Sequence, residues 1–334
     1  MKAMLLRERG PIESSPLRMV ELPDPSPGPG EVRVRVSACG ICRTDLHVIE
    51  GDLPPARTPV VPGHQIVGTV DMCGDGASRF ARGSRVGIAW LARTCGECPY
   101  CAAGRENLCD RPSFTGYHRN GGFAEYAVVP EAFAYPLPSA FRDAEATPLL
   151  CAGIIGFRAL RRSDLPRGGT LAIFGFGSSA HIVIQLALHR GCSVFVCTRG
   201  KDHRELAKRM GASWAGENPE EMPEHADSVI LFAPAGELVP PALKRLKKGG
   251  TLSIAGIHMS DVPPMKYEDC LFHEKNVRSV TANTRQDGED LLREAAEIPL
   301  LPKVTLFPLD EANHALQILK ADGLQGTGVL VVEG

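Results

Sequence analysis

Hydrophobic and polar positions follow two different rhythms along the chain. In the first 150 residues, short runs alternate apolar with polar residues or are broken by glycines, which is typical of half-buried strands. From about Cys151, apolar runs alternate with stretches of helical period. In the first part, the strand candidates are residues 30–42, 60–74, 83–92 and 121–130. In the second part, the strand candidates are residues 171–177, 193–199, 227–233, 251–257 and 276–283. Two helix candidates lie between these later strands, at residues 178–191 and 203–211. Strand–helix alternation predicts an α/β protein with a parallel sheet covered by helices on both faces.

The last fifty residues are mixed in character again. Residues 310–321 have the period of a helix, with Asp310 expected as its N-cap, and residues 328–334 predict a closing strand. We therefore expect a discontinuous β-rich domain, residues 1–150 and 286–334, around an inserted sheet domain, residues 151–285.

Composition narrows the class of protein. The 334 residues suffice for two domains, and 43% hydrophobic with 23% charged residues describes an ordinary globular chain. A formal net charge of −2 offers no basic excess for nucleic acid or an anionic membrane. We find no run of about 18 apolar residues, and the opening MKAMLLRERG lacks the apolar core of a signal peptide. A cytoplasmic protein is expected.

Eleven cysteines require an explanation, because cytoplasmic thiols stay reduced. Four of them form the pattern C-x2-C-x2-C-x7-C, at Cys95, Cys98, Cys101 and Cys109. Four thiolates satisfy tetrahedral Zn²⁺ without an open position, which describes a structural site; an iron–sulfur cluster is the alternative. The scattered cysteines are expected to pack as small buried hydrophobes. These are Cys73, Cys192, Cys197 and Cys270.

A glycine motif lies between a predicted strand and a predicted helix. It reads Gly175, Phe176, Gly177, Ser178, Ser179, Ala180 and fits G-x-G-x-x-[GA]. The first glycine permits a tight turn, the second lets backbone approach a pyrophosphate, and the small Ala180 allows close packing. The helix start offers free N–H groups to phosphates. The alternative is a turn without a ligand.

The end of the second predicted strand bears on which dinucleotide binds. An NAD site places a carboxylate there, to bind the ribose hydroxyls. Here the strand ends in Thr198 and Arg199, with no carboxylate until Asp202. A guanidinium can bind a 2′-phosphate through paired hydrogen bonds. We therefore favour NADP, and NAD remains possible if Arg199 is only a solvated charge.

The order of several motifs is specific. ACGICRTDLH, PGHQIVG, the four-cysteine segment, LLCAGIIGFRAL and GFGSSA follow one another as in the zinc-dependent alcohol dehydrogenases of the medium-chain dehydrogenase/reductase superfamily, which the whole chain resembles. The resemblance implies a GroES-like β-rich catalytic domain and a Rossmann domain with a doubly wound parallel sheet. It also implies an NAD(P)-dependent enzyme that moves hydride reversibly between an alcohol and an aldehyde or ketone, through a zinc-bound alkoxide.

The same resemblance assigns metal ligands. A catalytic Zn²⁺ would be bound by Cys42, His64 and Cys151, giving two zinc ions per chain, one catalytic and one structural. Two sulfurs and one imidazole leave a position for substrate. Asp45 resembles the carboxylate that holds the histidine ligand. Gln65 departs from the family, which commonly has Glu there, and a neutral amide leaves the site about one charge more positive.

Further roles are implied by position in the family motifs. Thr44 and His47 match a hydroxyl–imidazole proton relay. Arg43 matches a contact to the pyrophosphate, whereas the second arginine that relatives often place before V-L is absent at 326–328. Trp90 resembles an aromatic residue of the substrate pocket, and Ile257 a contact to the nicotinamide.

Two other classes of protein stay open. One is a zinc-free quinone or enoyl reductase of the same superfamily, and the other is a non-catalytic nucleotide-binding protein. Residues 116–128 resemble those of shorter microbial enzymes, which implies a homo-oligomer, a dimer or a homotetramer. The substrate is expected to be a small alcohol or aldehyde.

Overall fold

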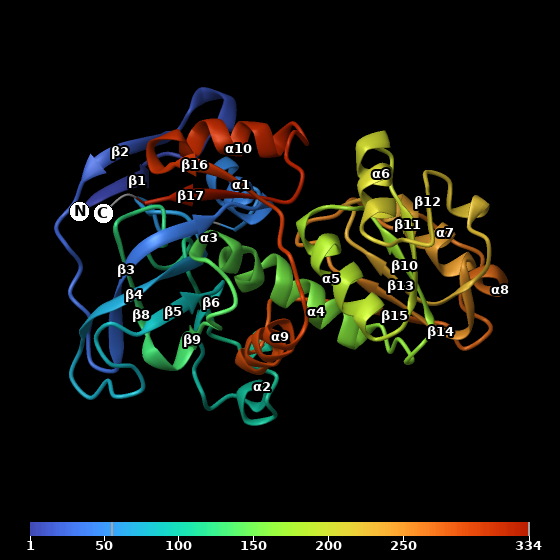
Figure 1. Cartoon of the computed structure of the whole chain (residues 1–334), viewed down its shortest axis with the longest axis horizontal. Coiled ribbons are helices and arrows are strands. Elements are labelled where there is room, and N and C mark those ends of the chain that lie inside the picture. Colours follow the sequence, from blue (N-terminus) through green and yellow to red (C-terminus); the bar gives the residue numbers. More distant parts are fainter. Residues whose placement is uncertain (55, 333–334) are drawn as a thin grey trace. The chain divides into compact units, whose positions relative to one another are not determined.

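The computed structural model describes residues 1–54 and 56–332 and divides the chain into two compact units (Figure 1). Unit 1 comprises Met1–Cys151, Ala282–Ala296 and Pro302–Gly334; unit 2 comprises Ala152–Thr281 and Glu297–Leu301. The chain therefore returns to unit 1 four residues before the position expected from the sequence, and it visits unit 2 again briefly after the helix that follows. Unit 1 is rich in strands and unit 2 alternates strands with helices, so the α/β class predicted from the sequence is confirmed.

Unit 1 is built on a seven-stranded sheet. Its strands follow the order β16-β17-β3-β4-β5-β9, and β8 also pairs with β3. The strands of unit 1 are β1 (Lys2–Leu6), β2 (Leu17–Glu21), β3 (Glu31–Gly40), β4 (Gln65–Cys73), β5 (Arg85–Ile88), β6 (Leu91–Arg93), β7 (Ser113–Phe114), β8 (Tyr126–Pro130), β9 (Ala134–Pro136), β16 (Val304–Pro308) and β17 (Thr327–Val331). Its helices are α1 (Arg43–Glu50), α2 (Pro99–Ala102), α3 (Asp143–Ala146), α9 (Arg285–Glu297) and α10 (Ala312–Lys320).

The long strand β3 organises this sheet. One of its edges pairs with β4, and the other is shared by β8 along its first half and β17 along its last residues. Val32, Val34 and Val36 are buried and alternate with more exposed arginines, as the two-residue period of a strand requires. The register places Gly40 opposite Gln65, so the residues just beyond these two are brought to one end of the sheet.

Unit 2 contains a six-stranded parallel sheet in the order β12-β11-β10-β13-β14-β15. Its strands are β10 (Thr170–Phe174), β11 (Ser193–Cys197), β12 (Trp214–Gly216), β13 (Ala226–Leu231), β14 (Leu246–Ile254) and β15 (Asn276–Ser279), and its helices are α4 (Ala152–Arg162), α5 (Ser178–His189), α6 (Lys201–Arg209), α7 (Val239–Lys244) and α8 (Tyr267–Cys270). Within this unit, α4 and α5 lie on one side of the strands and α7 and α8 on the other (Figure 1).

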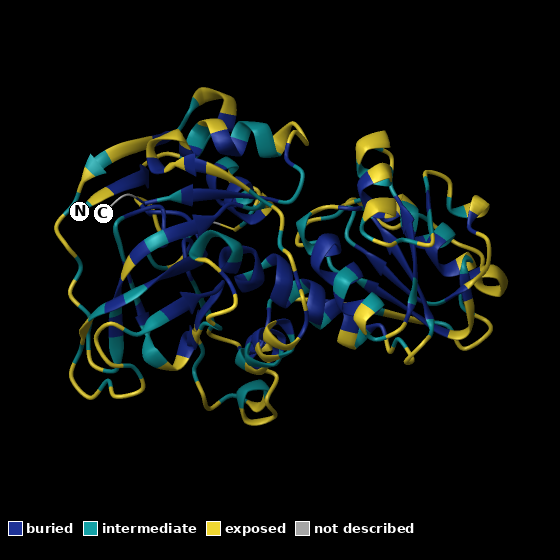
Figure 2. Ribbon diagram, viewed as in Figure 1, coloured by how far each residue is buried: buried dark blue, intermediate teal, exposed yellow. Residues whose placement is uncertain are grey.

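The central strands of unit 2 are buried on both faces. Every residue of β10 is buried, and the neighbouring strands are dark along most of their length in Figure 2. A strand covered on both faces needs a continuous apolar run rather than an alternating one. This is the reason that the hydrophobic rhythm changes where unit 2 begins.

Two local expectations are wrong. Asp310 does not cap α10: it lies inside a 3-10 turn (Leu309–Glu311), and Glu311 occupies the cap position without a side-chain hydrogen bond. The extra turn moves the start of the helix to Ala312. Cys73 is exposed at the end of β4 and does not pack as a buried hydrophobe, because the strand runs beyond the core there. The other scattered thiols, Cys192, Cys197 and Cys270, are buried.

No helix in the described part of the chain has the length and apolar character needed to cross a membrane.

Candidate functional site

Three metal-ligating side chains, far apart in sequence, meet in unit 1. Cys42, His64 and Cys151 each place one donor atom within 4.8 Å of the other two. Cys42 precedes α1, and His64 precedes β4. They are neighbours because β3 and β4 pair in the register that sets Gly40 beside Gln65. Cys42 Sγ and His64 Nε2 are 3.3 Å apart.

The buried carboxylate of Asp45 fixes the positions of Cys42 and His64 through hydrogen bonds. Asp45 is 1% exposed and accepts three hydrogen bonds, from the Cys42 N–H at 2.9 Å, the Gly63 N–H at 3.3 Å and His64 Nδ1 at 3.0 Å. Because Nδ1 of His64 donates to Asp45, Nε2 is the nitrogen that faces the two sulfurs. The pKa of His64 is lowered by burial, but the charges of Asp45 and Cys42 outweigh this effect and raise it well above its usual range.

The donor set fits a tetrahedral metal ion. Zn–S and Zn–N bonds of about 2.3 and 2.1 Å imply a sulfur-to-nitrogen separation of about 3.6 Å, close to the one observed. The hydrogen bond from Cys151 holds the pKa of the Cys42 thiol well below its usual range despite burial. Two sulfurs and one imidazole leave the fourth tetrahedral position open.

The side chain of Gln65 is a second indication that a polar ligand or a water molecule binds at the three-donor site. Its side chain is fully buried next to His64, and among the described residues neither its Oε1 nor its Nε2 has a hydrogen-bond partner. Buried polar atoms without partners are rare in proteins and mark positions where a water or ligand belongs. A Cβ on Gly40 would lie 3.1 Å from the Gln65 amide, so the glycine leaves room for it.

The four cysteines of the C-x2-C-x2-C-x7-C segment form a separate cluster. The Sγ atoms of Cys95, Cys98, Cys101 and Cys109 all lie within 4.8 Å of one another. Cys95 Sγ is 3.9 Å from Cys101 Sγ and 3.5 Å from Cys109 Sγ, near the separation of about 3.8 Å expected for four sulfurs around zinc. Hydrogen bonds from the backbone of Glu97 and Cys98 lower the pKa of the Cys95 thiol to about 6. All eleven cysteines are free thiols.

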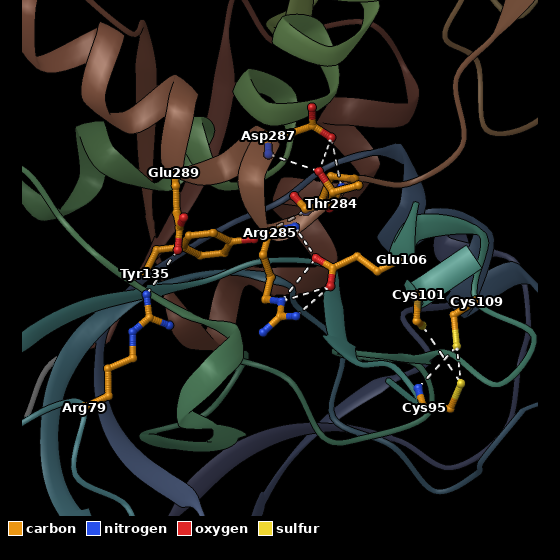
Figure 3. Close-up of polar contacts among 11 residues, drawn as sticks. Arg79, Cys95, Cys101, Glu106, Cys109, Tyr135, Thr284, Arg285, Asp287 and Glu289 are labelled. Carbon is orange, nitrogen blue, oxygen red and sulfur yellow. Dashed lines mark hydrogen bonds and ion pairs between the residues drawn. The ribbon is translucent and has the colours of Figure 1, made fainter. Parts of the chain in front are cut away.

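This four-cysteine lobe is attached to α9 by a buried carboxylate (Figure 3). Glu106 lies between Cys101 and Cys109 and accepts hydrogen bonds from Arg285, through the backbone N–H at 2.5 Å and the guanidinium at 2.8–3.1 Å. Arg285 is the first residue of α9. The lobe therefore packs against the helix through a charged contact rather than an apolar core of its own.

The two predicted relay residues lie on α1. Thr44 is buried, and its N–H bonds to Cys42 Sγ at 3.3 Å. His47 follows three residues later, which places it on the same face of the helix. Its Nδ1 lies 2.8 Å from Asp52 Oδ2, and the N–H of Asp52 bonds to the carbonyl of His47 at 3.0 Å. Asp52 thus holds both the ring and the backbone of His47.

Trp90 lies beside the three-donor site. Its ring meets His64 edge-on, with centroids 5.1 Å apart. It stacks with Phe114 at 4.9 Å and with Tyr117 at 5.8 Å. The indole is therefore part of an aromatic cluster that begins at a predicted metal ligand.

The glycine motif forms the turn from β10 into α5 in unit 2. Gly175 has φ +87°, and a Cβ there would lie 2.8 Å from the backbone nitrogen of Ala233, so only glycine fits. Gly177 precedes the first residue of α5, is exposed, and a Cβ on it would meet nothing within 4 Å. This open approach to a helix N-terminus suits a pyrophosphate. Ser178 and Ser179 form the first turn, and Phe176 and Ala180 are buried.

The remaining predicted cofactor residues also lie in loops of unit 2. Thr198 and Arg199 follow β11, and the Arg199 side chain is exposed. Arg204 donates to the carbonyl oxygens of both residues, at 3.0 Å for Thr198, and pairs with Glu217 at 3.2 Å. Ile257 follows β14 and is half exposed.

Arg43 is the predicted pyrophosphate contact of unit 1, and it has a partner that the sequence did not indicate. Its guanidinium bonds to Asp322 at 2.6 Å. Asp52 and Asp322 are both missed by reasoning from the sequence. The Gly51–Asp52 step after α1, a typical helix end, could have drawn attention to Asp52. Nothing local in the sequence points to Asp322, which is 279 positions from Arg43.

Comparison with known proteins places this geometry in a family. Residues 28–139 match the alcohol dehydrogenase GroES-like domain, and residues 179–297 match the zinc-binding dehydrogenase domain. A protein described as probable alcohol dehydrogenase AdhA, from Mycobacterium tuberculosis, is 48% identical over 99% of this chain and 97% of its own length. The chain belongs to the zinc-type alcohol dehydrogenases of the medium-chain dehydrogenase/reductase superfamily.

Solved structures agree with this assignment. The crystal structure of an NAD-dependent alcohol dehydrogenase covers 100% of both chains, with 28% identity and a TM-score of 0.90. A thermostable alcohol dehydrogenase from Pyrobaculum aerophilum, bound to cobalt and zinc, covers 99% of both chains, with 26% identity and a TM-score of 0.88. The predictions of the family, of a GroES-like domain with a Rossmann domain, and of an NAD(P)-dependent alcohol dehydrogenase are confirmed.

Proposed function

We propose that this alcohol dehydrogenase works with zinc bound by Cys42, His64 and Cys151, and that a second, structural zinc is held by the four-cysteine lobe. The substrate class is a small alcohol, oxidised reversibly to an aldehyde or ketone. The observation that carries this proposal is the convergence of three donors that are far apart in sequence, with Asp45 fixing the histidine so that Nε2 faces the sulfurs. The bound metals of the Pyrobaculum relative support it.

The chemistry divides between bound groups and side chains. Zinc, when bound, supplies a Lewis acid for the substrate oxygen, and the nicotinamide accepts or returns the hydride. Asp45 orients His64 and makes it a better ligand. Trp90 and its stacked neighbours form an aromatic surface beside the ligands, which favours slender substrates. The neutral Gln65 leaves the site about one charge more positive than a glutamate would.

A proton must leave the site when an alcohol is oxidised. Thr44 is the buried hydroxyl next to Cys42, and His47 is the imidazole on the same face of α1, closer to solvent. We assign the hydroxyl to hold the substrate proton and the imidazole to pass it on, since an imidazole can accept a proton at one ring nitrogen and donate one from the other. Asp52 positions His47 by accepting from Nδ1, which turns Nε2 away from Asp52.

NADP is the proposed dinucleotide. The exposed Arg199 follows β11, where an NAD site would place a carboxylate. Arg204 binds the carbonyl oxygens of Thr198 and Arg199 and so fixes the loop that presents the guanidinium. We expect higher kcat/KM with NADP than with NAD, and Arg199→Ala should reduce that ratio about tenfold. An unchanged ratio would assign Arg199 to the solvated surface.

We also propose a homo-oligomer in a reducing, cytoplasmic compartment. The edge strand β15 of the parallel sheet has one neighbour, β14, in the described structure, and exposed apolar residues lie on and before it. These are Tyr267, Phe272 and Val277. An exposed apolar sheet edge is suited to pairing with another copy. Sedimentation equilibrium should show dimers or tetramers, and Val277→Lys should weaken them.

The decisive experiment combines metal analysis with catalysis. Purified protein should contain close to two zinc ions per chain. A panel of alcohols and aldehydes, followed by the absorbance of reduced nicotinamide with both dinucleotides, should show turnover that stops when the more labile zinc is chelated and returns when zinc is restored. Turnover that persists without this zinc, on quinones or enoyl substrates, would favour the zinc-free reductase instead.

A further inference from the structure

A pair of opposite charges occupies the predicted pyrophosphate contact of unit 1. Arg43 is the first residue of α1, next to the metal ligand Cys42, and its Nη2 lies 2.6 Å from Oδ1 of Asp322. Asp322 belongs to the turn between α10 and β17. The two side chains are 47% and 73% exposed, so solvent and a ligand can both reach the pair.

The turn holds Asp322 in place. Asp322 has φ +57°, a left-handed conformation that Asp and Asn adopt more readily than most residues. Its N–H bonds to the carbonyl of Leu319 at 3.2 Å, and the next N–H bonds to that of Ile318 at 2.9 Å. These bonds end α10 and fix the backbone of the turn from which the carboxylate reaches Arg43 on α1. Lys320, the cation nearest in sequence, is bound by Glu13 and Glu50 instead.

Carboxylates and phosphates bind a guanidinium in the same way. Each offers two oxygens to the planar N–H groups of arginine. A pyrophosphate that approaches Arg43 must therefore displace the Asp322 carboxylate or lie beside its negative charge. No arginine stands at 326–328 to provide a second cation.

We propose that Asp322 competes with the dinucleotide for Arg43 and so lowers the affinity of the enzyme for its cofactor. The inference rests on the proposed dehydrogenase function and on the predicted role of Arg43 as a pyrophosphate contact. Because exposed ion pairs are weak, the cofactor can open this one, and Asp322 adjusts affinity without blocking the site. Weaker binding also means faster cofactor release, since differences in affinity between related complexes lie mostly in the dissociation rate.

The test uses the full-length, zinc-loaded enzyme and Asp322→Asn. Asparagine tolerates the same backbone conformation, so the turn should be retained. Isothermal titration with NADP and with NAD should show binding about two- to fivefold tighter than in the unchanged protein, the range expected for one exposed ion pair. Stopped-flow displacement should show slower release, and the gain should shrink as salt is raised.

A matched control removes the same charge elsewhere on the same surface. Glu13→Gln breaks the contact with Lys320 and leaves Arg43 untouched, so dinucleotide affinity should stay constant. If Glu13→Gln tightens binding as much as Asp322→Asn, the effect is one of net charge and the competition is refuted.

A double-mutant cycle separates this inference from the function on which it rests. Arg43→Ala should weaken dinucleotide binding, and Asp322→Asn should then have no further effect in that background. If Arg43→Ala weakens binding but Asp322→Asn alone does not tighten it, the competition is wrong and the role of Arg43 stands. If Arg43→Ala leaves the affinity unchanged, the pyrophosphate contact itself is wrong and the competition fails with it.

Discussion

The two groups of metal-ligating residues in unit 1 use similar donors but are assembled in opposite ways. Cys95, Cys98, Cys101 and Cys109 lie within fifteen consecutive residues, and backbone N–H groups in or just after this segment donate to the sulfurs of Cys95 and Cys109. Cys42, His64 and Cys151 are spread over more than a hundred positions. Cys42 and His64 meet because β3 and β4 pair in one register and Asp45 holds the histidine, and Cys151 joins them from the end of a 3-10 turn (Thr147–Leu150).

We infer from this difference that a metal would stabilise the fold of the four-cysteine segment, whereas at the three-donor site it would bind to a geometry that the sheet already provides. A closed set of four ligands on a short, polar segment leaves a metal little to do except hold that segment together. A three-donor site built by the sheet already has its shape, and a metal bound there would keep a fourth position available to substrate. Removing a ligand should therefore affect catalysis at one site and stability at the other.

The largest expected effect is on catalysis, at the three-donor site. Cys42→Ser should reduce kcat/KM by about a thousandfold or more, because several kcal/mol of Lewis-acid stabilisation are lost. Metal analysis should show that zinc falls from about two to about one per chain. Cys39→Ala is the matched control, since this thiol is buried three residues away and lies outside the donor set. If Cys42→Ser keeps two zinc ions and normal turnover, the proposed catalytic site is wrong.

The next effect is on stability, at the four-cysteine lobe. Cys101→Ser should release the structural zinc and loosen the segment that Glu106 ties to α9. We expect the midpoint of thermal unfolding to fall by more than about 5 °C, and hydrogen exchange to rise across residues 95–109. Cys42→Ser should leave both readouts nearly unchanged. Equal destabilisation by the two variants would contradict the distinction drawn between the sites.

A smaller effect on turnover is expected when the proposed proton relay is interrupted at Thr44. Thr44→Val should lower turnover by about a hundredfold while zinc content stays the same, because the hydroxyl next to Cys42 is lost and the ligands are not. Thr44→Ser restores a hydroxyl and should recover most of the activity. Normal turnover in the valine variant would remove Thr44 from the relay.

The smallest expected effect is on zinc affinity, and it distinguishes the role of Asp45 from that of Asp52. Asp45→Asn should weaken zinc binding by about 10–100-fold, since His64 loses the carboxylate that orients it. Asp52→Asn makes the same chemical change at the partner of His47. It should keep zinc affinity and reduce only turnover. Competition with a chromogenic chelator measures the affinity, and a loss of zinc in both variants would show that Asp45 has no special role.

Sequence reasoning works best where a feature is local. The spacing of the four cysteines and the glycines of the β10–α5 turn each lie within one short segment, so their chemistry can be inferred without a fold. The apolar runs of unit 2 likewise predict strands buried on both faces. The predicted cap at Asp310 is wrong because an additional 3-10 turn precedes α10. Such one-turn choices depend on tertiary contacts that propensity does not report.

The alternation of strands and helices, the glycine turn before α5 and the four-cysteine segment can each be recognised in the sequence, because each depends on residues close together in the chain. Folding is needed to show that Asp45 accepts three hydrogen bonds, that Asp52 holds His47 and that Asp322 reaches Arg43. It is also needed to show that the buried Gln65 side chain has no hydrogen-bond partner among the described residues. These contacts depend on strand register and on where a helix ends. A shift of one residue in either would turn the same side chains elsewhere.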